Sequence, residues 1–344
     1  MNPYITFLFI SNLALGTIIT ATSYHWFLAW VGLEMNTLSI IPILAKHHHP
    51  RATEASTKYF ITQATASSII LFSSVFNAWH TGMWDIMQLS AHPAPTMLTL
   101  ALAMKLGLAP FHFWLPEVMQ GTDTTTALIV ATSQKLPPMT LLFLTSNQLT
   151  TSTLLLLAMI STLIGGWSGL NQTQLRKIMA FSSIGHMGWM AAISTISKKL
   201  LLFTLMVYLV MTTSLFLTMI NSTTKTTKDL GMLWTTSPTL STLTTITLMT
   251  LGGLPPLSGF LPKWLILQEL TTNHLILTAT ILAMSSLLSL MFYMRLTFTT
   301  TLTISPNTTN STMKWRLKPT KLISPSPIII STFFLIPITP LIFY

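Results

Sequence analysis

The stretches GLAPFHFWLPE, residues 107–117, and GLPPLSGFLPK, residues 253–263, decide the fold of this chain. The second begins 146 residues after the first, and a glycine, two leucines and two prolines coincide in the alignment. Both lie inside long apolar segments. Because proline lacks a backbone donor and clashes with the carbonyl four residues back, each segment must break or kink if it is helical. We therefore predict an internal repeat built on two broken helices; chance identity in Leu- and Pro-rich sequence is the alternative.

The sequence around these stretches is that of an integral membrane protein. Of 344 residues, 50% are hydrophobic and only 7% are charged, whereas soluble domains carry about 25% charged residues. A membrane-spanning helix needs about 20 mostly apolar residues. We expect an all-α polytopic protein with about eleven transmembrane helices, at 3–22, 25–45, 58–79, 96–120, 124–146, 150–170, 175–196, 199–220, 239–268, 273–298 and 322–343.

The two quoted stretches fall in the fourth and ninth expected spans. An offset of five spans is odd, so one copy is inverted in the membrane relative to the other. Paired broken helices in an inverted repeat are a sequence indicator of a transport site near the middle of the bilayer.

Four charged residues lie within apolar segments: Glu34, Lys105, Lys135 and Lys263. A charge in mid-membrane costs at least about 2.5–3.5 kcal/mol and usually marks an ion or proton path. Each lysine lies within five residues of a proline, and a helix break there frees carbonyls and admits the water that a buried ammonium needs. We predict a proton relay; a lysine that extends to the interface is the alternative, plausible for Lys263 and weak for the other two.

Other titratable residues are candidates for the same relay. We expect Glu34 to pair first with Lys105, with a purely structural ion pair as the alternative. His112 and His186 titrate near neutral pH and could pass protons between the lysines, or be satisfied core histidines. Glu117 aligns with Lys263 in the repeat, either as a second pore acid or as the interfacial end of its span.

The remaining lysines and arginines predict the orientation. Twelve lie in loops on the side of the N-terminus and two on the other side, which places the N-terminus in the cytoplasm or matrix. The twelve are Lys46, Arg51, Lys58, Arg176, Lys177, Lys225, Lys228, Arg295, Lys314, Arg316, Lys318 and Lys321, and the two are Lys198 and Lys199.

Several classes of function are disfavoured by what the sequence lacks. There is no cysteine, which excludes Cys-ligated iron–sulfur clusters and zinc sites. No Walker A motif and no strand followed by GxGxxG is present, so neither an ATP site nor a nicotinamide site is visible. The basic residues are scattered without aromatic interleaving, and we expect no nucleic-acid partner. The run 47–49 of three histidines reads as a solvated loop and not as a metal site.

Four motifs carry a family resemblance: WVGLEMNTLSIIPIL at 30–44, MKLGLAPFHFWLPEV at 104–118, SQKLPP at 133–138 and LGGLPPLSGFLPKW at 251–264. Through them the chain resembles, over essentially its whole length, the antiporter-like membrane subunits of respiratory complex I, whose relatives include Mrp-type cation/proton antiporters. Longer relatives begin with three further helices. The resemblance implies two inverted five-helix repeats, 1–147 and 148–298, then a matrix-side loop, 299–321, and a C-terminal helix, 322–344. It also implies that Glu34, Lys105, Lys135 and Lys263 form the relay.

The resemblance further implies a proton-translocating core subunit of an NADH:ubiquinone reductase, with no cofactor in this chain and FMN, iron–sulfur clusters and ubiquinone in other subunits. The implied partners are a neighbouring antiporter-like subunit, small core membrane subunits and phospholipids. The implied location is the mitochondrial inner membrane, with the N-terminus in the matrix and the C-terminus in the intermembrane space. A stand-alone Mrp-type antiporter subunit and a non-pumping membrane scaffold are the alternatives.

Overall fold

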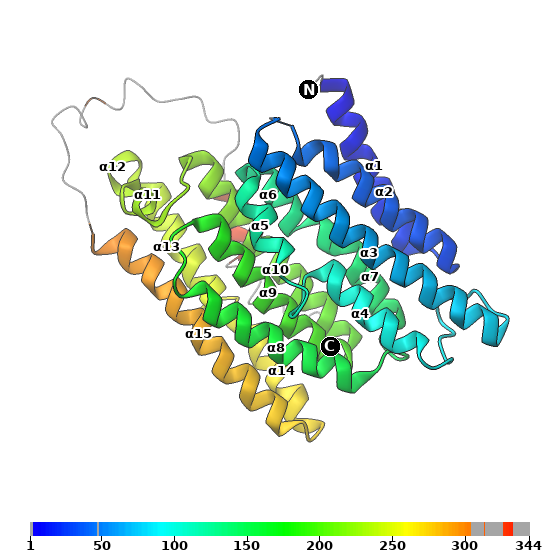
Figure 1. Ribbon diagram of the computed structural model, residues 1–344. Helices are drawn as coiled ribbons and strands as arrows, with labels where there is room; N and C mark the ends of the chain where they lie inside the picture. Colours follow the sequence, from blue (N-terminus) through cyan, green and yellow to red (C-terminus); the bar gives the residue numbers. More distant parts are fainter. Residues whose placement is uncertain (1–2, 47, 304–312, 314–325, 333–344) are drawn as a thin grey trace.

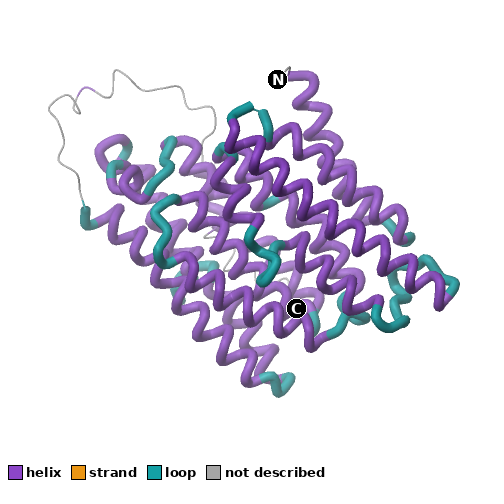
Figure 2. The backbone as a smooth tube through the Cα atoms, in the orientation of Figure 1, coloured by secondary structure: helices purple, strands orange, loops and turns teal. Residues whose placement is uncertain are grey.

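The computed structural model describes residues 3–46, 48–303, 313 and 326–332. Within this part of the chain the regular structure is helical, without a β-strand (Figure 2). The helices run side by side in a bundle that has α1 at one edge and α15 at the opposite edge (Figure 1).

The N-terminal half of the bundle contains seven α-helices and one 3-10 helix. They are α1 Pro3–Thr22, α2 Trp26–Leu44, α3 Pro50–Thr81, α4 Ala94–Leu106, α5 Trp114–Gly121, α6 Thr124–Ala131, η1 Ser133–Lys135 and α7 Leu136–Thr145.

The C-terminal half contains eight α-helices between residues 151 and 301. They are α8 Thr151–Gly169, α9 Leu175–Ser194, α10 Lys198–Ser222, α11 Thr227–Gly231, α12 Leu233–Thr236, α13 Pro238–Gly252, α14 Phe260–Thr272 and α15 Ile276–Thr301. Only residues 326–332 of the eleventh expected span are described, and they are helical.

Seven helical segments of the described residues are long and apolar enough to cross a membrane. They are α1, α2, α3, the segment Thr124–Thr145, α8, α10 and α15. The other expected spans before residue 300 are the helix pairs α4–α5 and α13–α14, which are interrupted, and the more polar α9. The expected range of the third span, 58–79, was too short. Helix α3 begins eight residues earlier, at Pro50.

Both interruptions begin in the same way. Gly107, the residue that follows α4, has a positive φ of 75°, and Gly253, the residue that follows α13, has a positive φ of 80°. Each glycine N–H donates back to the last turn of its own helix. An L-residue with a side chain rarely adopts this conformation. The glycines that open the two quoted stretches therefore end each helix within the bundle.

Small residues allow the helices to approach closely. A Cβ on Gly32 of α2 would lie 3.0 Å from the carbonyl oxygen of Gly16 on α1. A Cβ on Gly165 of α8 would lie 2.8 Å from the backbone nitrogen of Gly185 on α9. Contacts of this kind stabilise helix pairs in lipid, where the hydrophobic effect does not drive association.

The many hydroxyl groups in the helices are satisfied locally. Thr99, Thr145 and Thr244 each donate to a carbonyl three or four residues back, at 2.7–2.8 Å. This pairing explains why so many threonines are tolerated inside apolar helices.

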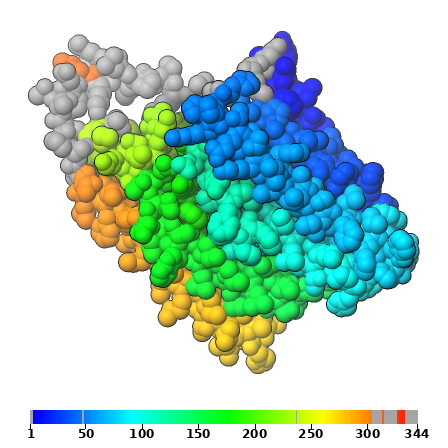
Figure 3. Space-filling view, viewed as in Figure 1, coloured from blue at the N-terminus to red at the C-terminus, as the bar shows by residue number. Residues whose placement is uncertain are grey.

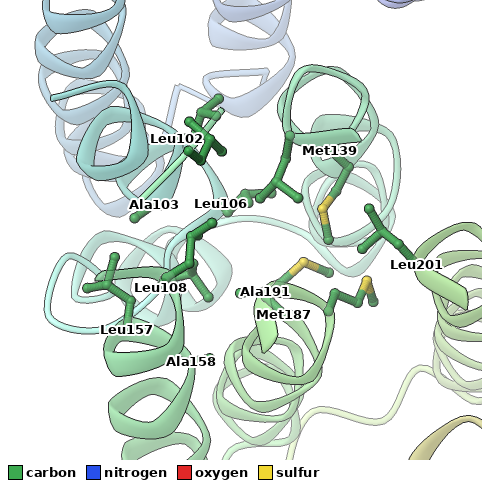
Figure 4. Close-up of a cluster of buried hydrophobic side chains, with 14 of the residues drawn as sticks. Leu102, Ala103, Leu106, Leu108, Met139, Leu157, Ala158, Met187, Ala191 and Leu201 are labelled. Carbon is green, nitrogen blue, oxygen red and sulfur yellow. The ribbon is translucent and has the colours of Figure 1, made fainter. Parts of the chain in front are cut away.

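An apolar cluster fills the junction between the two halves (Figure 4). It joins α4 and the first interruption to α7, α8, α9 and α10 through buried leucine, methionine and alanine side chains. The labelled members are Leu102, Ala103, Leu106, Leu108, Met139, Leu157, Ala158, Met187, Ala191 and Leu201. In the space-filling view, segments of both halves pack without a wide opening between them (Figure 3).

Candidate functional site

Lys135 lies at the centre of the bundle, in the 3-10 turn η1 between α6 and α7. Its side chain is among the most buried of the described residues, with 1% of the residue exposed. The Nζ atom donates to the carbonyl of Leu106, the last residue of α4, and lies 5.5 Å from the ring centroid of Trp114. A carbonyl and an aromatic face are both groups that stabilise an ammonium.

The local backbone explains why a carbonyl is available there. Gly107 turns the chain out of the helix, so the Leu106 carbonyl is left for a side chain to bind. In the neighbouring turn the Lys135 N–H donates to Thr132 instead of Ala131, at 3.1 Å. The carbonyl of Ala131 accepts instead from the hydroxyl of Tyr208 on α10, at 2.9 Å. The break that the sequence predicted in the fifth span is thus a single 3-10 turn. The carbonyls of Ala131 and Thr132 at its start both accept hydrogen bonds.

Two aromatic side chains, Trp114 and Tyr59, pack next to the Lys135 turn. The indole Nε1 of Trp114 donates to the carbonyl of Met104 at 3.2 Å. Tyr59 of α3 lies edge-on to the indole, with ring centroids 5.7 Å apart. Its hydroxyl donates to Oε1 of Gln134, the residue before Lys135, at 3.0 Å. Met104 and Leu106, whose carbonyls bind Trp114 and Lys135, are the neighbours of Lys105 in the chain.

Glu34 is bound by hydroxyl groups. Its Oε2 accepts from Thr37 Oγ1 at 2.8 Å, and its Oε1 accepts from Ser67 Oγ of α3 at 2.6 Å. No ion pair within 4.0 Å joins it to Lys105 among the described residues, so the direct contact expected from the sequence is not formed. The Lys105 ammonium is buried and makes no hydrogen bond within the described part of the chain, although the charge of Glu34 acts on it through space.

Lys263 lies in the second interruption and is partly buried. Its Nζ donates to the carbonyl of Gly252, the last residue of α13, at 3.0 Å. It lines a cavity of about 20 Å³ together with His186 of α9 and Ser182, Ser285 and Ser289. A polar cavity of this size can hold a water molecule. The structure thus brings His186 together with Lys263.

His112 and Glu117 have different surroundings. His112 lies in the first interruption, is 5% exposed, and its Nδ1 makes no hydrogen bond to another described residue. Glu117 is half exposed on α5 and pairs with Lys58 of α3 at 2.7 Å. Lys58 also pairs with Glu54 at 2.5 Å. Glu117 therefore lies at a groove that is also lined by Arg51 and by these partners.

Sequence reasoning missed the uncharged members of the site. On α3, Tyr59, Gln63 and Ser67 are all buried and follow one another at intervals of four residues. This spacing puts them on one face of the helix, and it was the signal that could have found them. Trp114 lies in the first quoted stretch, but the interpretation of that stretch rested on its prolines and charged residues.

Buried and partly buried lysines at interrupted helices are a feature of the class of antiporter-like membrane proteins. A family model described as NADH:quinone oxidoreductase/Mrp antiporter, transmembrane, matches residues 23–289. A second one, NADH dehydrogenase subunit 2 C-terminus, matches residues 290–343. The chain belongs to the NADH-ubiquinone oxidoreductase chain 2 family and is thus a membrane subunit of respiratory complex I.

Relatives of known name support this assignment over almost the full length. The chain is 55% identical to NADH-ubiquinone oxidoreductase chain 2 of Salmo salar over 341 residues, which cover 99% of this chain and 98% of the relative. It is 53% identical to the chain of the same name from Latimeria chalumnae, with the same coverage.

Solved structures share the fold. A chain of respiratory complex I from Thermus thermophilus with bound aureothin is 26% identical, with a TM-score of 0.85 over 97% of this chain and 77% of that chain. A chain of the Mrp complex from Dietzia sp. DQ12-45-1b is 19% identical, with a TM-score of 0.78 over 87% of this chain and 61% of that chain. The second likeness concerns the fold alone.

Proposed function

We propose that this chain translocates protons across the mitochondrial inner membrane through a relay of Glu34, Lys105, Lys135 and Lys263, with His112 and His186 as further proton-passing groups. Electron transfer takes place in other subunits of the complex, which hold FMN, the iron–sulfur clusters and the quinone site, and the relay responds to it through neighbouring membrane subunits. The likeness to a subunit of complex I and the family membership support this role.

The observation that carries the proposal is a pair of equivalent carbonyls. Leu106 and Gly252 each precede a glycine of positive φ, 146 residues apart. The carbonyl of Leu106 binds the ammonium of the buried Lys135, which comes from the next span, and the carbonyl of Gly252 binds that of the partly buried Lys263, which comes from the second half of the same broken helix. The equivalence of the two carbonyls supports a repeat, which we propose to be an inverted one of residues 1–147 and 148–298 in a chain of eleven spans.

In the proposed sequence of steps, the interaction between Glu34 and Lys105 changes first. Glu34 has no direct bond to Lys105, so small movements of α2, α3 or α4 alter the field at the lysine. Because Met104 and Leu106 bind Trp114 and Lys135, a change at Lys105 reaches Lys135. A proton then leaves Lys135 towards Lys263 and the cavity beside His186.

The orientation is part of the proposal. Counting lysines and arginines in the loops places the N-terminus in the matrix and the C-terminus in the intermembrane space. The proposed partners are a neighbouring antiporter-like subunit, small membrane subunits of the complex and phospholipids.

The test is proton translocation per electron in an assembled complex that carries Lys135→Met, with NADH oxidation followed in parallel. Methionine keeps the length and removes the titratable group, so we expect fewer protons per electron or loss of coupled turnover with normal assembly. Lys199→Met, an exposed lysine at the start of α10, is the matched control and should leave the ratio unchanged. An unchanged ratio in Lys135→Met would make this chain a scaffold.

A further inference from the structure

Trp114 contacts Lys135, the end of α4 and Tyr59, although it carries no titratable group. It is 6% exposed on the first residue of α5. Its ring faces the Lys135 ammonium at 5.5 Å, its Nε1 donates to Met104 at 3.2 Å, and its ring edge-contacts Tyr59 at 5.7 Å. These contacts fix the plane of the indole from two sides.

The contacts of Trp114 bear on one lysine. A tryptophan face stabilises an ammonium but not a neutral amine, and it does so more strongly the further the cation is desolvated. Lys135 is 1% exposed, so its cation is well desolvated. The indole therefore interacts more favourably with one protonation state of Lys135 than with the other.

We propose that Trp114 is a positioning residue of the relay, which holds Lys135 in its protonated state and releases this hold when the end of α4 moves. The proposal rests on the relay function of Lys135. The Met104 carbonyl that anchors the indole is the neighbour of Lys105, so a displacement at Lys105 shifts the ring that lies over Lys135. Proton release from Lys135 is thereby linked to the position of Lys105 without a bond between the two lysines.

The titratable groups on the elements near the Lys135 turn remain in place in the test. They are Lys105 on α4, Tyr59 on α3, His112 in the first interruption, Tyr208 on α10 and His186 on α9, whose ring lies 5.6 Å from that of Tyr208.

The experiment measures the pH dependence of coupled proton pumping in the assembled complex carrying Trp114→Leu. Leucine leaves the ammonium without an aromatic face, so a lower pH is needed to keep Lys135 protonated. We expect the half-maximal pH of pumping to fall by about one unit, as a tenfold loss of proton affinity requires. Trp114→Phe keeps an aromatic face and should shift the profile by less.

Two controls separate this role from a structural one. Trp167→Leu removes a tryptophan that is 73% exposed on α8 and should leave the profile unchanged. In the double variant Trp114→Leu with Lys135→Met, the pH profile of the residual pumping should coincide with that of Lys135→Met alone, because the indole acts through Lys135. A purely structural tryptophan would lower the amount of complex or its rate at every pH.

The proposal is overturned if Trp114→Leu assembles with an unchanged pH profile, or if its shift persists in the Lys135→Met background. Should Trp114→Leu fail to assemble, Trp114→Phe decides: a profile that coincides with the parent at every pH overturns the proposal, and a partial acid shift supports it. If Lys135→Met alone leaves pumping intact, the relay function fails, and this result is distinguishable because it does not involve Trp114.

Discussion

At the scale of single residues, the buried charges differ in how they are held. Lys135 and Lys263 each bind a carbonyl that a helix break leaves free, whereas Lys105 has no hydrogen bond within the described residues. Glu34 is held by two hydroxyls from α2 and α3. Leaving a buried ionic group unpaired is costly, so Lys105 is the member of the set most responsive to a change in its surroundings.

This difference leads to a prediction for Glu34→Gln. The amide oxygen still accepts a hydroxyl hydrogen bond, so the fold is retained, but the charge that acts on Lys105 is lost. A unit charge at close range is worth roughly 1–4 kcal/mol at the effective dielectric of a protein. We expect normal assembly and slower NADH oxidation that an uncoupler does not restore, because an uncoupler removes the proton-motive force and not a block within the relay. The measurement is the NADH oxidation rate with and without an uncoupler.

Thr37→Val is the matched control for this prediction. It removes one hydroxyl from Glu34 but keeps the carboxylate charge, and we expect a smaller effect. Equal effects of the two changes would mean that hydrogen bonding at Glu34, and not its charge, sets the rate.

At the scale of elements, the interruptions depend on glycine and proline. Gly107 and Gly253 adopt positive φ, and the proline-rich segments that follow cannot continue a helix. Within the second interruption the backbone folds tightly, because a Cβ on Gly259 would lie only 1.8 Å from the carbonyl oxygen of Thr250. No rotamer change relieves a clash between two backbone segments.

We therefore predict that Gly259→Ala displaces the segment between α13 and α14. Overpacking of this kind costs typically about 1–3 kcal/mol or more, and we expect a reduced amount of assembled complex. Gly252→Ala lies seven residues earlier, where the new Cβ would have its nearest contact at 3.7 Å, and it should assemble normally. Native gel electrophoresis of the membranes measures both. Normal assembly of Gly259→Ala would show that the segment can yield.

At the scale of the whole molecule, the bundle places two broken helices on either side of a shared apolar junction. The side chain of Leu106 is part of this junction, and its carbonyl binds the Lys135 ammonium. Figure 4 shows this junction as a packed apolar region between α4, α7, α8, α9 and α10. A polar contact also joins the halves, because Tyr208 of α10 donates to the carbonyl of Ala131 beside the Lys135 turn.

The proposed orientation yields a prediction that the absence of cysteine makes simple to test. A single cysteine at Lys228, on the side with twelve basic residues, should react with a membrane-impermeant maleimide only from the matrix side. A single cysteine at Lys199 should react only from the opposite side. Both positions are exposed. Mass spectrometry of this chain after labelling of intact and inverted membranes gives the result; the reverse pattern would invert the topology.

The sequence by itself determined the membrane class, most helix positions, both interruptions and the four charges within apolar segments. These features are local: apolar length, proline chemistry and the cost of a charge in lipid act within one segment. The resemblance carried by the motifs around those charges also gave the family, which the comparisons confirmed.

Only the tertiary structure decided which groups meet. That Lys135 binds Leu106, that Trp114 covers it, and that Glu34 takes hydroxyls from Thr37 and Ser67 instead of touching Lys105 depend on how α2, α3, α4 and α5 pack. Contacts between residues distant in sequence follow from side-chain packing of the whole bundle, which no single segment encodes. For that reason the charged members of the site were predictable and the aromatic and hydroxyl groups that position them were not.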